Sequence, residues 1–290
     1  MRILIIGASG LIGSNAKQHF LEKGHLVLGT YFSYQSTNDI YLNTLNDNLL
    51  QNSEIEAFNP EWIIHTGALT HVDKCELEPK LSHQQTVIST ENIIKLADKY
   101  SCKILYISTD YVFDGTNGPY FENDSVNPIN VYGQHKLESE NLVKIYSNNL
   151  IIRVTNVYGN EERNKNFVAR LVQNINSSQH AELKLPIDQY ATPVNALDVA
   201  KAMELLISHR KAGIYNIAST DYMNRVQLAN VVLQHYNYLD IKVISTDTKS
   251  LKQAAKRPLN GGLKSHKFLQ EFPDFTFHSV KDYLLSMQSK

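Results

Sequence analysis

The feature that most constrains this chain is a glycine-rich segment that follows an aliphatic run at the N-terminus. The run at 2–6 is nearly uninterrupted by polar residues, which predicts a strand buried on both faces. Glycines then stand at positions 7, 10 and 13, and a helix is expected through 14–21. A second strand at 25–28 completes the pattern within about 30 residues, the size of one βαβ unit.

Each glycine has a physical task in a turn that binds a dinucleotide. Gly7 permits the tight turn, Gly10 leaves room for a pyrophosphate, and Gly13 lets the helix lie close to the sheet. The helix N-terminus offers free N–H groups and a positive dipole end to phosphate. A turn that binds nothing is the alternative, but the position between strand and amphipathic helix favours a cofactor. The expected contacts are Gly7, Ser9, Gly10, Leu11, Ile12 and Gly13.

Strand-like and helix-like segments alternate through the first half of the chain. Further strands are expected at 39–43, 62–65, 103–107 and 150–154, and helices at 49–57, 82–100 and 131–146. This repetition predicts the α/β class, with a doubly wound, Rossmann-like parallel sheet. Residues 1–158 would form an NAD(P)-binding domain. Residues 159–290 would mostly form a smaller substrate-binding subdomain, with some elements returning to the sheet, and a further strand is expected at 213–217.

Composition and charge exclude several classes of function. Lys and Arg number 28 against 29 Asp and Glu, so no basic stripe indicates nucleic acid. Aliphatic runs are far shorter than the roughly 20 residues that cross a bilayer, so no membrane span is expected. Met1 leads directly into the first strand, which leaves no room for a signal peptide. Cys75 and Cys102 form no CxxC and the histidines no metal motif, so we expect a cytoplasmic protein without a metal.

The residues after the second strand bear on which dinucleotide is preferred. An Asp or Glu at this point binds the ribose hydroxyls in NAD-preferring sites, but 30–33 contains neither and the nearest acid is Asp39. Nothing here repels a 2′-phosphate and no Arg or Lys here attracts one, so NADP(H) is favoured by a small margin over NAD(H). Asn43, after the third strand, is expected to touch the adenine, with an ordinary surface turn as the alternative.

Tyr132 and Lys136 are the most informative pair of the chain, because residues at i and i+4 share one helix face. A free phenol has a pKa of about 10. A nearby ammonium should lower that pKa, so Tyr132 could exchange a proton with an alcohol or alkoxide. Thr109 ends a neighbouring strand and can hydrogen-bond the same carbonyl oxygen. YxxxK also occurs on solvated helices, but its order after the glycine turn and Thr109 favours hydride transfer between a dinucleotide and a carbonyl.

Several segments together resemble one family. By them the chain is similar to the extended short-chain dehydrogenases/reductases, in the branch of dTDP-4-dehydrorhamnose reductase. The resemblance spans nearly the whole chain; its most diagnostic part is 108–115, whereas the glycine turn is generic. The matching segments are GASGLIG at 7–13, THVDKCE at 70–76, STDYVFDG at 108–115, YGQHKLESE at 132–140, DQY at 188–190 and RP at 257–258.

The resemblance implies an enzyme of dTDP-rhamnose biosynthesis that uses NAD(P)H to reduce the ketone of a nucleotide sugar and could form a homodimer. By it, Tyr132 would donate the proton, Lys136 would lower its pKa and bind the nicotinamide ribose, and Thr109 would polarise the carbonyl. The other residues that it assigns are Ala68, Leu69 and Thr70 beside the cofactor, and Asp110, Asn156, Asn166 and Gln189 beside the substrate.

Two positions on the expected substrate side depart from the rhamnose enzymes. Asn156 stands where they typically have Trp, and 190–194 reads YATPV where they tend to continue with Gly and Pro-Thr. The sugar could therefore be another deoxy-keto hexose. The regulatory beta subunit of methionine adenosyltransferase is similar over the same segments, so a non-catalytic NADP-binding subunit is an alternative. An epimerase or dehydratase is another, although Tyr111 stands where a dehydratase usually has an acid.

Overall fold

The centre of the molecule is a parallel sheet of seven strands in the order β3-β2-β1-β4-β5-β6-β9. The computed structural model describes residues 1–36, 38–177 and 180–288. The strands are β1 (Arg2–Ile6), β2 (Leu26–Tyr31), β3 (Asp39–Tyr41), β4 (Trp62–His65), β5 (Lys103–Thr109), β6 (Leu150–Val154) and β9 (Gly213–Asn216). The predicted doubly wound α/β fold is confirmed. Its order reverses between β1 and β4, which opens a crevice at the carboxyl ends of these strands.

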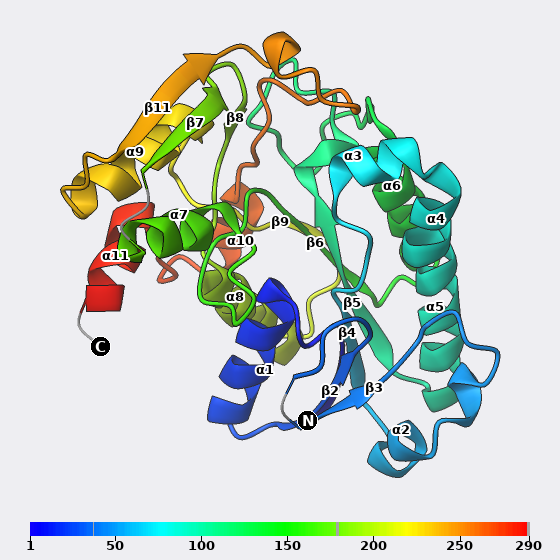
Figure 1. Ribbon diagram of the computed structural model, residues 1–290. Coiled ribbons are helices and arrows are strands. Elements are labelled where there is room, and N and C mark those ends of the chain that lie inside the picture. Colours follow the sequence, from blue (N-terminus) through cyan, green and yellow to red (C-terminus); the bar gives the residue numbers. More distant parts are fainter. Residues whose placement is uncertain (37, 178–179, 289–290) are drawn as a thin grey trace.

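Helices cover both faces of the sheet. Figure 1 shows α1 and α8 side by side on one face, and α4, α5 and α6 stacked on the other. The helices around the main sheet are α1 (Leu11–Glu22), α2 (Ser53–Phe58), α3 (Val72–Leu77), α4 (Pro79–His83), α5 (Ser89–Tyr100), α6 (Val131–Lys144) and α8 (Ala196–Ser208).

The aliphatic run of β1 explains why the sheet is buried on both sides. Ile3 and Ile5 are completely buried in one cluster with Phe20 of α1. Leu4 and Ile6 point to the opposite face and pack in a second cluster with Val143 of α6. Successive side chains of a strand alternate between faces, so a strand with two buried faces must be apolar at nearly every position.

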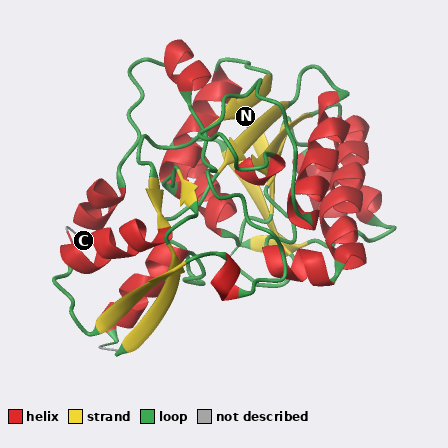
Figure 2. Cartoon of the chain, turned by 90° about the horizontal axis from the view of Figure 1, so that it is seen from above, coloured by secondary structure: helices red, strands yellow, loops and turns green. Residues whose placement is uncertain are grey.

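The C-terminal part adds a third core beside the sheet. Its elements are α7 (Phe167–Asn176), β7 (Ala181–Pro186), β8 (Tyr190–Ala191), β10 (Met223–Asn224), α9 (Arg225–His235), β11 (Ile241–Thr246), α10 (His266–Glu271) and α11 (Val280–Gln288). β7 and β11 pair in parallel and extend away from the main sheet, as Figure 2 shows. The side chains of α7, α9 and α11 pack together around Tyr158. β9 lies in this half of the chain and pairs with β6 in the main sheet.

Two predicted helices are interrupted. The segment at 49–57 is a 3-10 turn followed by α2, because the side chain of Asn52 accepts a hydrogen bond from the N–H of Ile55 and begins a new helix there. The segment at 82–100 contains a π-helical turn at Gln84–Ile88 between α4 and α5. Within the described ranges, no helix has the length and apolar character needed to cross a membrane.

Candidate active site

The glycine-rich turn forms a cradle at the amino end of α1. Gly7 has a φ of +83°, a conformation that side chains rarely adopt, and its carbonyl accepts from the N–H of Gly10 at 3.0 Å. Gly10 precedes α1, whose first turn has no side-chain cap and no acidic residue. The first N–H groups of α1 are therefore left for an anion.

The space around Gly10 and Gly13, tested by adding a Cβ atom to each, shows that the two glycines have different roles. A Cβ at Gly13 would lie 2.2 Å from the carbonyl oxygen of Gly7, so this position is closed by packing between turn and helix. A Cβ at Gly10 would meet only that same oxygen, at 3.4 Å, and otherwise open space. Ser9, Leu11 and Ile12 belong to the same turn. These residues fit a dinucleotide whose pyrophosphate lies against Gly10 and the start of α1.

Other residues predicted for the cofactor lie along the same edge of the sheet. Asn43 follows β3, and its side-chain oxygen accepts from the N–H of Leu45 at 3.0 Å. The segment 68–70, which contains Ala68, Leu69 and Thr70, follows β4 and is partly exposed. The structure thus brings the predicted cofactor residues to the carboxyl ends of β1, β3 and β4.

Thr109 and Tyr132 meet at the carboxyl edge. Thr109 ends β5, and its hydroxyl accepts from the N–H of Tyr111 at 3.2 Å. Tyr132 lies in the first turn of α6, which Asn130 caps by accepting from the N–H of Gly133 at 2.8 Å. The Tyr132 phenol hydrogen-bonds with Thr109, and its ring packs edge-on against Tyr111 with centroids 5.5 Å apart. A phenol and a hydroxyl from different elements therefore meet at this edge of the sheet.

Lys136 lies one turn further along α6 and is 4% exposed. Its Nζ donates to the carbonyl oxygen of Ile107 at 2.5 Å and lies 4.1 Å from the ring centroid of Tyr106. Burial lowers the pKa of Lys136 to about 7, against a smaller opposite effect of Glu140. The ammonium is thus held against β5 by the Ile107 carbonyl and the Tyr106 ring.

The pKa of Tyr132 differs from the expectation. Burial raises the pKa of the phenol, and the hydrogen bond with Thr109 offsets only part of this rise. The predicted lowering by Lys136 is not found, because that ammonium is directed to Ile107 and Tyr106. Tyr132 is accordingly a protonated phenol at neutral pH, which suits a proton donor.

Asp110 is tied to the protein on every side. Its carboxylate accepts from the hydroxyl of Thr155 at 2.7 Å, the N–H of Gly262 at 3.1 Å and the hydroxyl of Thr109 at 3.3 Å. Burial raises its pKa, against these hydrogen bonds. Asp110 thus joins the end of β5 to the segment after β6 and to the C-terminal half. It lies next to Thr109, but its oxygens are engaged by protein groups.

A cleft of about 970 Å³ lies between this edge of the sheet and the C-terminal half. Asn156, Asn166, Gln189 and Tyr111 line it. In the described part of the chain, its lining includes no Asp or Glu. Its cations are Lys165, Arg170, Lys184, Arg225 and Arg257. A cleft with this charge is suited to an anionic ligand.

The predicted substrate residues Asn156, Asn166 and Gln189 share this cleft, and each of them is hydrogen-bonded to another protein group. Asn166 caps α7 by accepting from the N–H of Ala169 at 3.0 Å and donates to the carbonyl of Gly159 at 2.9 Å. Gln189 donates to the hydroxyl of Thr248 at 2.9 Å. Asn156 accepts from the Arg225 guanidinium at 2.5 Å, so all three residues shape the wall of the cleft.

Sequence reasoning did not find Arg225. Its guanidinium lies 5.2 Å from the ring centroid of Phe167, and burial lowers its pKa. The usable signal was the pattern Asn224-Arg225-x-Gln227, a capping box that places an arginine in the first turn of α9. Arg257, which also lines the cleft, has its Nη2 2.8 Å from Asp73 of α3, so this cation is already paired.

The Rossmann-like fold, with Thr109, Tyr132 and Lys136 at the carboxyl edge of its sheet, defines the class of NAD(P)-dependent oxidoreductases. Within this class the chain belongs to the RmlD substrate binding domain family, whose model matches residues 1–284. The resemblance predicted from the sequence is confirmed.

Known proteins of two kinds are similar to this chain. Methionine adenosyltransferase 2 subunit beta of Xenopus laevis is 30% identical over 275 residues, which cover 92% of this chain and 81% of that protein. The dTDP-4-dehydrorhamnose reductase of Escherichia coli K12 is 28% identical over 284 residues, covering 94% and 92%.

Among solved structures, a dTDP-4-dehydrorhamnose reductase from Clostridium acetobutylicum superposes with a TM-score of 0.85 at 30% identity, covering 99% of this chain and 100% of that one. A dTDP-4-dehydrorhamnose reductase from Bacillus anthracis, in complex with NADP, has a TM-score of 0.87 at 24% identity, covering 99% and 98%. At 24% identity, the similarity to the Bacillus anthracis structure concerns the fold alone.

Proposed function

We propose that this protein reduces the ketone of a deoxy-keto sugar carried on a nucleoside diphosphate, with NADPH as the preferred reductant. The substrate class is that in the name of the similar dTDP-4-dehydrorhamnose reductases. The observation that carries this proposal is the contact between Tyr132 and Thr109 above the buried Lys136, between the glycine cradle and a cleft lined by cations.

The chemistry divides between the cofactor and three side chains. When bound, the dinucleotide supplies a hydride to the carbonyl carbon. Tyr132 gives its phenolic proton to the carbonyl oxygen, so the ketone becomes a secondary alcohol and the phenol becomes a phenolate. Thr109 holds the carbonyl oxygen by a hydrogen bond. Lys136 lies one turn further along α6, where it would hold the nicotinamide ribose, and the phenolate regains its proton from solvent.

The cleft suits the diphosphate of such a substrate. Arg225 and Arg170 influence each other electrostatically, and neither has a carboxylate within ion-pair distance among the described residues. A diphosphate would place its charge between them. In this proposal residues 159–290 supply most of the substrate side, with Asn156, Asn166 and Gln189 along the sugar, while 1–158 hold the cofactor.

Three further points belong to the same proposal. NADPH is preferred because no acid follows β2. The enzyme works in the cytoplasm, since both cysteines are free thiols, one buried and one half-buried, and a reducing compartment keeps them so. It could act as a homodimer, which sedimentation of the purified protein would decide.

The test is turnover with a panel of nucleoside-diphosphate keto sugars, followed by the absorbance of NADPH. We expect one member to be reduced, and Tyr132→Phe to lower kcat by about 100-fold or more, because it removes the proton donor. Tyr146→Phe is the control, since it removes an exposed phenol just after the far end of the same helix, where the hydroxyl donates to Asp98 at 2.9 Å. Equal loss in both variants, or full activity of Tyr132→Phe, would contradict the proposed roles.

A second function is favoured by the similarity to the beta subunits. In that case the chain binds a dinucleotide without turning over a sugar and assembles with a methionine adenosyltransferase. Cofactor binding without reduction of any sugar of the panel, together with co-purification of such a partner, would decide for this alternative.

A further inference from the structure

We propose that Arg163, on the loop after β6, selects NADPH over NADH by binding the 2′-phosphate of the cofactor. The inference rests on the proposed function, because it assumes that the glycine-rich turn holds a dinucleotide. Nothing in the sequence near β2 offers a cation for this phosphate, and the structure supplies one from a segment about 130 residues further along the chain.

The end of β2 lacks the group that would reject a 2′-phosphate. The strand ends at Tyr31, at the distance from the glycines where an Asp or Glu otherwise binds the ribose hydroxyls. Asp39 is the nearest acid, but its side chain is 1% exposed and accepts from Lys17 at 2.5 Å and from Ser36. Its carboxylate is therefore satisfied inside the protein, and Lys17 is engaged with it.

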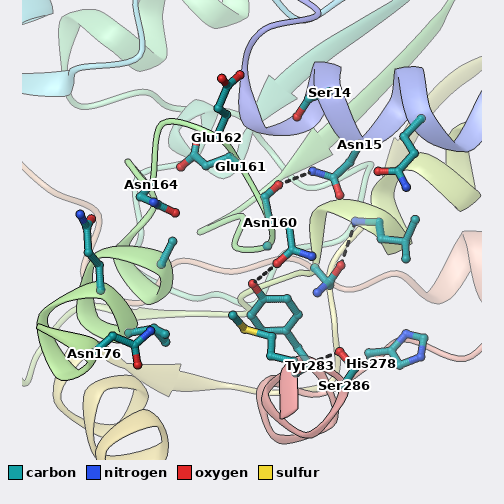
Figure 3. Close-up of a pocket in the computed structure, with 18 of the residues that line it drawn as sticks. Ser14, Asn15, Asn160, Glu161, Glu162, Asn164, Asn176, His278, Tyr283 and Ser286 are labelled. Atoms are coloured by element: carbon teal, nitrogen blue, oxygen red, sulfur yellow. Dashed lines mark hydrogen bonds between the residues drawn. The ribbon is translucent and has the colours of Figure 1, made fainter. Parts of the chain in front are cut away.

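The loop at 159–166 is held against α1 at one end and closed on itself at the other. Figure 3 shows Asn160 of this loop beside α1, where its carbonyl oxygen accepts from Asn15 at 2.8 Å. At the other end, the amide of Asn166 donates to the carbonyl of Gly159 at 2.9 Å. These two bonds fix the ends of the loop and carry its tip, which includes Glu162 and Arg163, toward the loop between β2 and β3.

At the tip of this loop, Arg163 contacts the β2–β3 loop without forming an ion pair in the described part of the chain. Its guanidinium lies 5.1 Å from the ring centroid of Tyr34. Arg163 is half-buried, and within the described ranges no carboxylate lies within ion-pair distance of it. The adjacent acid, Glu162, is hydrogen-bonded to the Tyr34 phenol instead. A planar guanidinium beside the expected ribose has the donor geometry that a phosphate requires.

The experiment measures cofactor binding directly, by calorimetry with NADPH and with NADH, without a sugar. The natural protein should bind NADPH about tenfold or more tightly than NADH, as one charge-assisted contact can provide. In Arg163→Ala the affinity for NADPH should fall by about tenfold while the affinity for NADH stays within about twofold. Retained NADH binding also shows that the variant is folded.

Arg210→Ala is the matched control, because Arg210 is exposed and follows α8 at the opposite edge of the sheet. It should change neither affinity. An equal loss for both cofactors in Arg163→Ala, an unchanged preference, or no preference in the natural protein would overturn the inference while leaving the proposed function intact. If the natural protein binds neither cofactor, the proposed function fails and the inference falls with it.

Discussion

Lys136 is a charged side chain with almost no access to water. It is 4% exposed, and its partners are a backbone carbonyl and the ring of Tyr106. A ring and a carbonyl replace only part of the hydration of an ammonium, which is why the pKa of Lys136 falls to about 7. A protein keeps such a group where its charge has a task, and here it lies below Tyr132.

The depressed pKa predicts a specific pH dependence of stability. Between about pH 7, the folded value, and about pH 10, the unfolded value, the unfolded chain binds more protons at Lys136 than the folded chain does. The free energy of unfolding should therefore rise with pH in this window, by at most about 1.4 kcal/mol per pH unit, and this contribution should be constant below it.

Denaturant unfolding of the natural protein and of Lys136→Met across this pH range checks the prediction. The difference between the two free energies should be flat below about pH 7 and should move in favour of the natural protein above it. A difference that does not change with pH would show that Lys136 keeps its ordinary pKa.

At the scale of elements, the turn between β1 and α1 separates stability from binding. Gly13→Ala should lower the free energy of unfolding by about 1–3 kcal/mol, because its Cβ would lie 2.2 Å from the Gly7 oxygen. Gly10→Ala should unfold like the natural protein, yet bind the dinucleotide about tenfold or more weakly, because its methyl group occupies the space of the pyrophosphate. Thermal unfolding and calorimetric binding measure the two effects, and unweakened binding in Gly10→Ala would contradict the placement of the cofactor.

The attachment of α6 to the sheet depends on a buried ion pair. Arg153 of β6 donates to both oxygens of Glu140 of α6, at 2.8 and 2.7 Å, and both side chains are at most 1% exposed. The Arg153 guanidinium is the main favourable influence that holds the pKa of Glu140 below its usual range despite burial.

Glu140→Ala should destabilise the protein by about 3–5 kcal/mol, because it leaves the Arg153 charge buried without a partner. Lys144→Ala removes an exposed partner of the same carboxylate, 3.4 Å away, and should cost less than about 1 kcal/mol. Urea unfolding of both variants is the measurement. Similar losses of unfolding free energy in the two variants would show that the buried Glu140–Arg153 pair contributes no more to stability than the exposed Lys144 does.

At the scale of the whole molecule, the cleft exists only because two halves of the chain face each other. Asp73 of α3 pairs with Arg257 at 2.8 Å, and Asp110 at the end of β5 accepts from the N–H of Gly262 at 3.1 Å. Such contacts hold the C-terminal half over the carboxyl edge of the sheet.

Arg225→Gln should weaken the binding of dTDP or UDP by about tenfold, because it removes a buried cation from the cleft. The affinity of the natural protein should also fall as salt is added. Lys103→Gln is the control, since Lys103 begins β5 at the opposite edge of the sheet. Calorimetry with these diphosphates gives both results, and an affinity that neither Arg225 nor salt affects would place the diphosphate elsewhere.

The sheet and the glycine-rich turn could be predicted from short-range patterns in the sequence. The uninterrupted aliphatic residues of β1, the glycine spacing and the YxxxK pair are short-range patterns, and their physical causes act within a few residues. Thr109 and Tyr132 meet because the end of β5 and the start of the helix that follows it in the chain, α6, lie at the same edge of the sheet. The breaks in two helices and the raised pKa of Tyr132 did not follow, because capping competition and burial depend on surroundings.

The sequence by itself determined the fold class, the glycine turn and the three residues at the edge of the sheet, because each is encoded by periodicity or spacing within one or two elements. Only the tertiary structure decided that Arg225 enters the cleft, that Asp110 is bound by protein groups on every side, and that Arg163 reaches Tyr34. These contacts join residues about 40 to 150 positions apart, and no local pattern specifies which side chains long loops bring together.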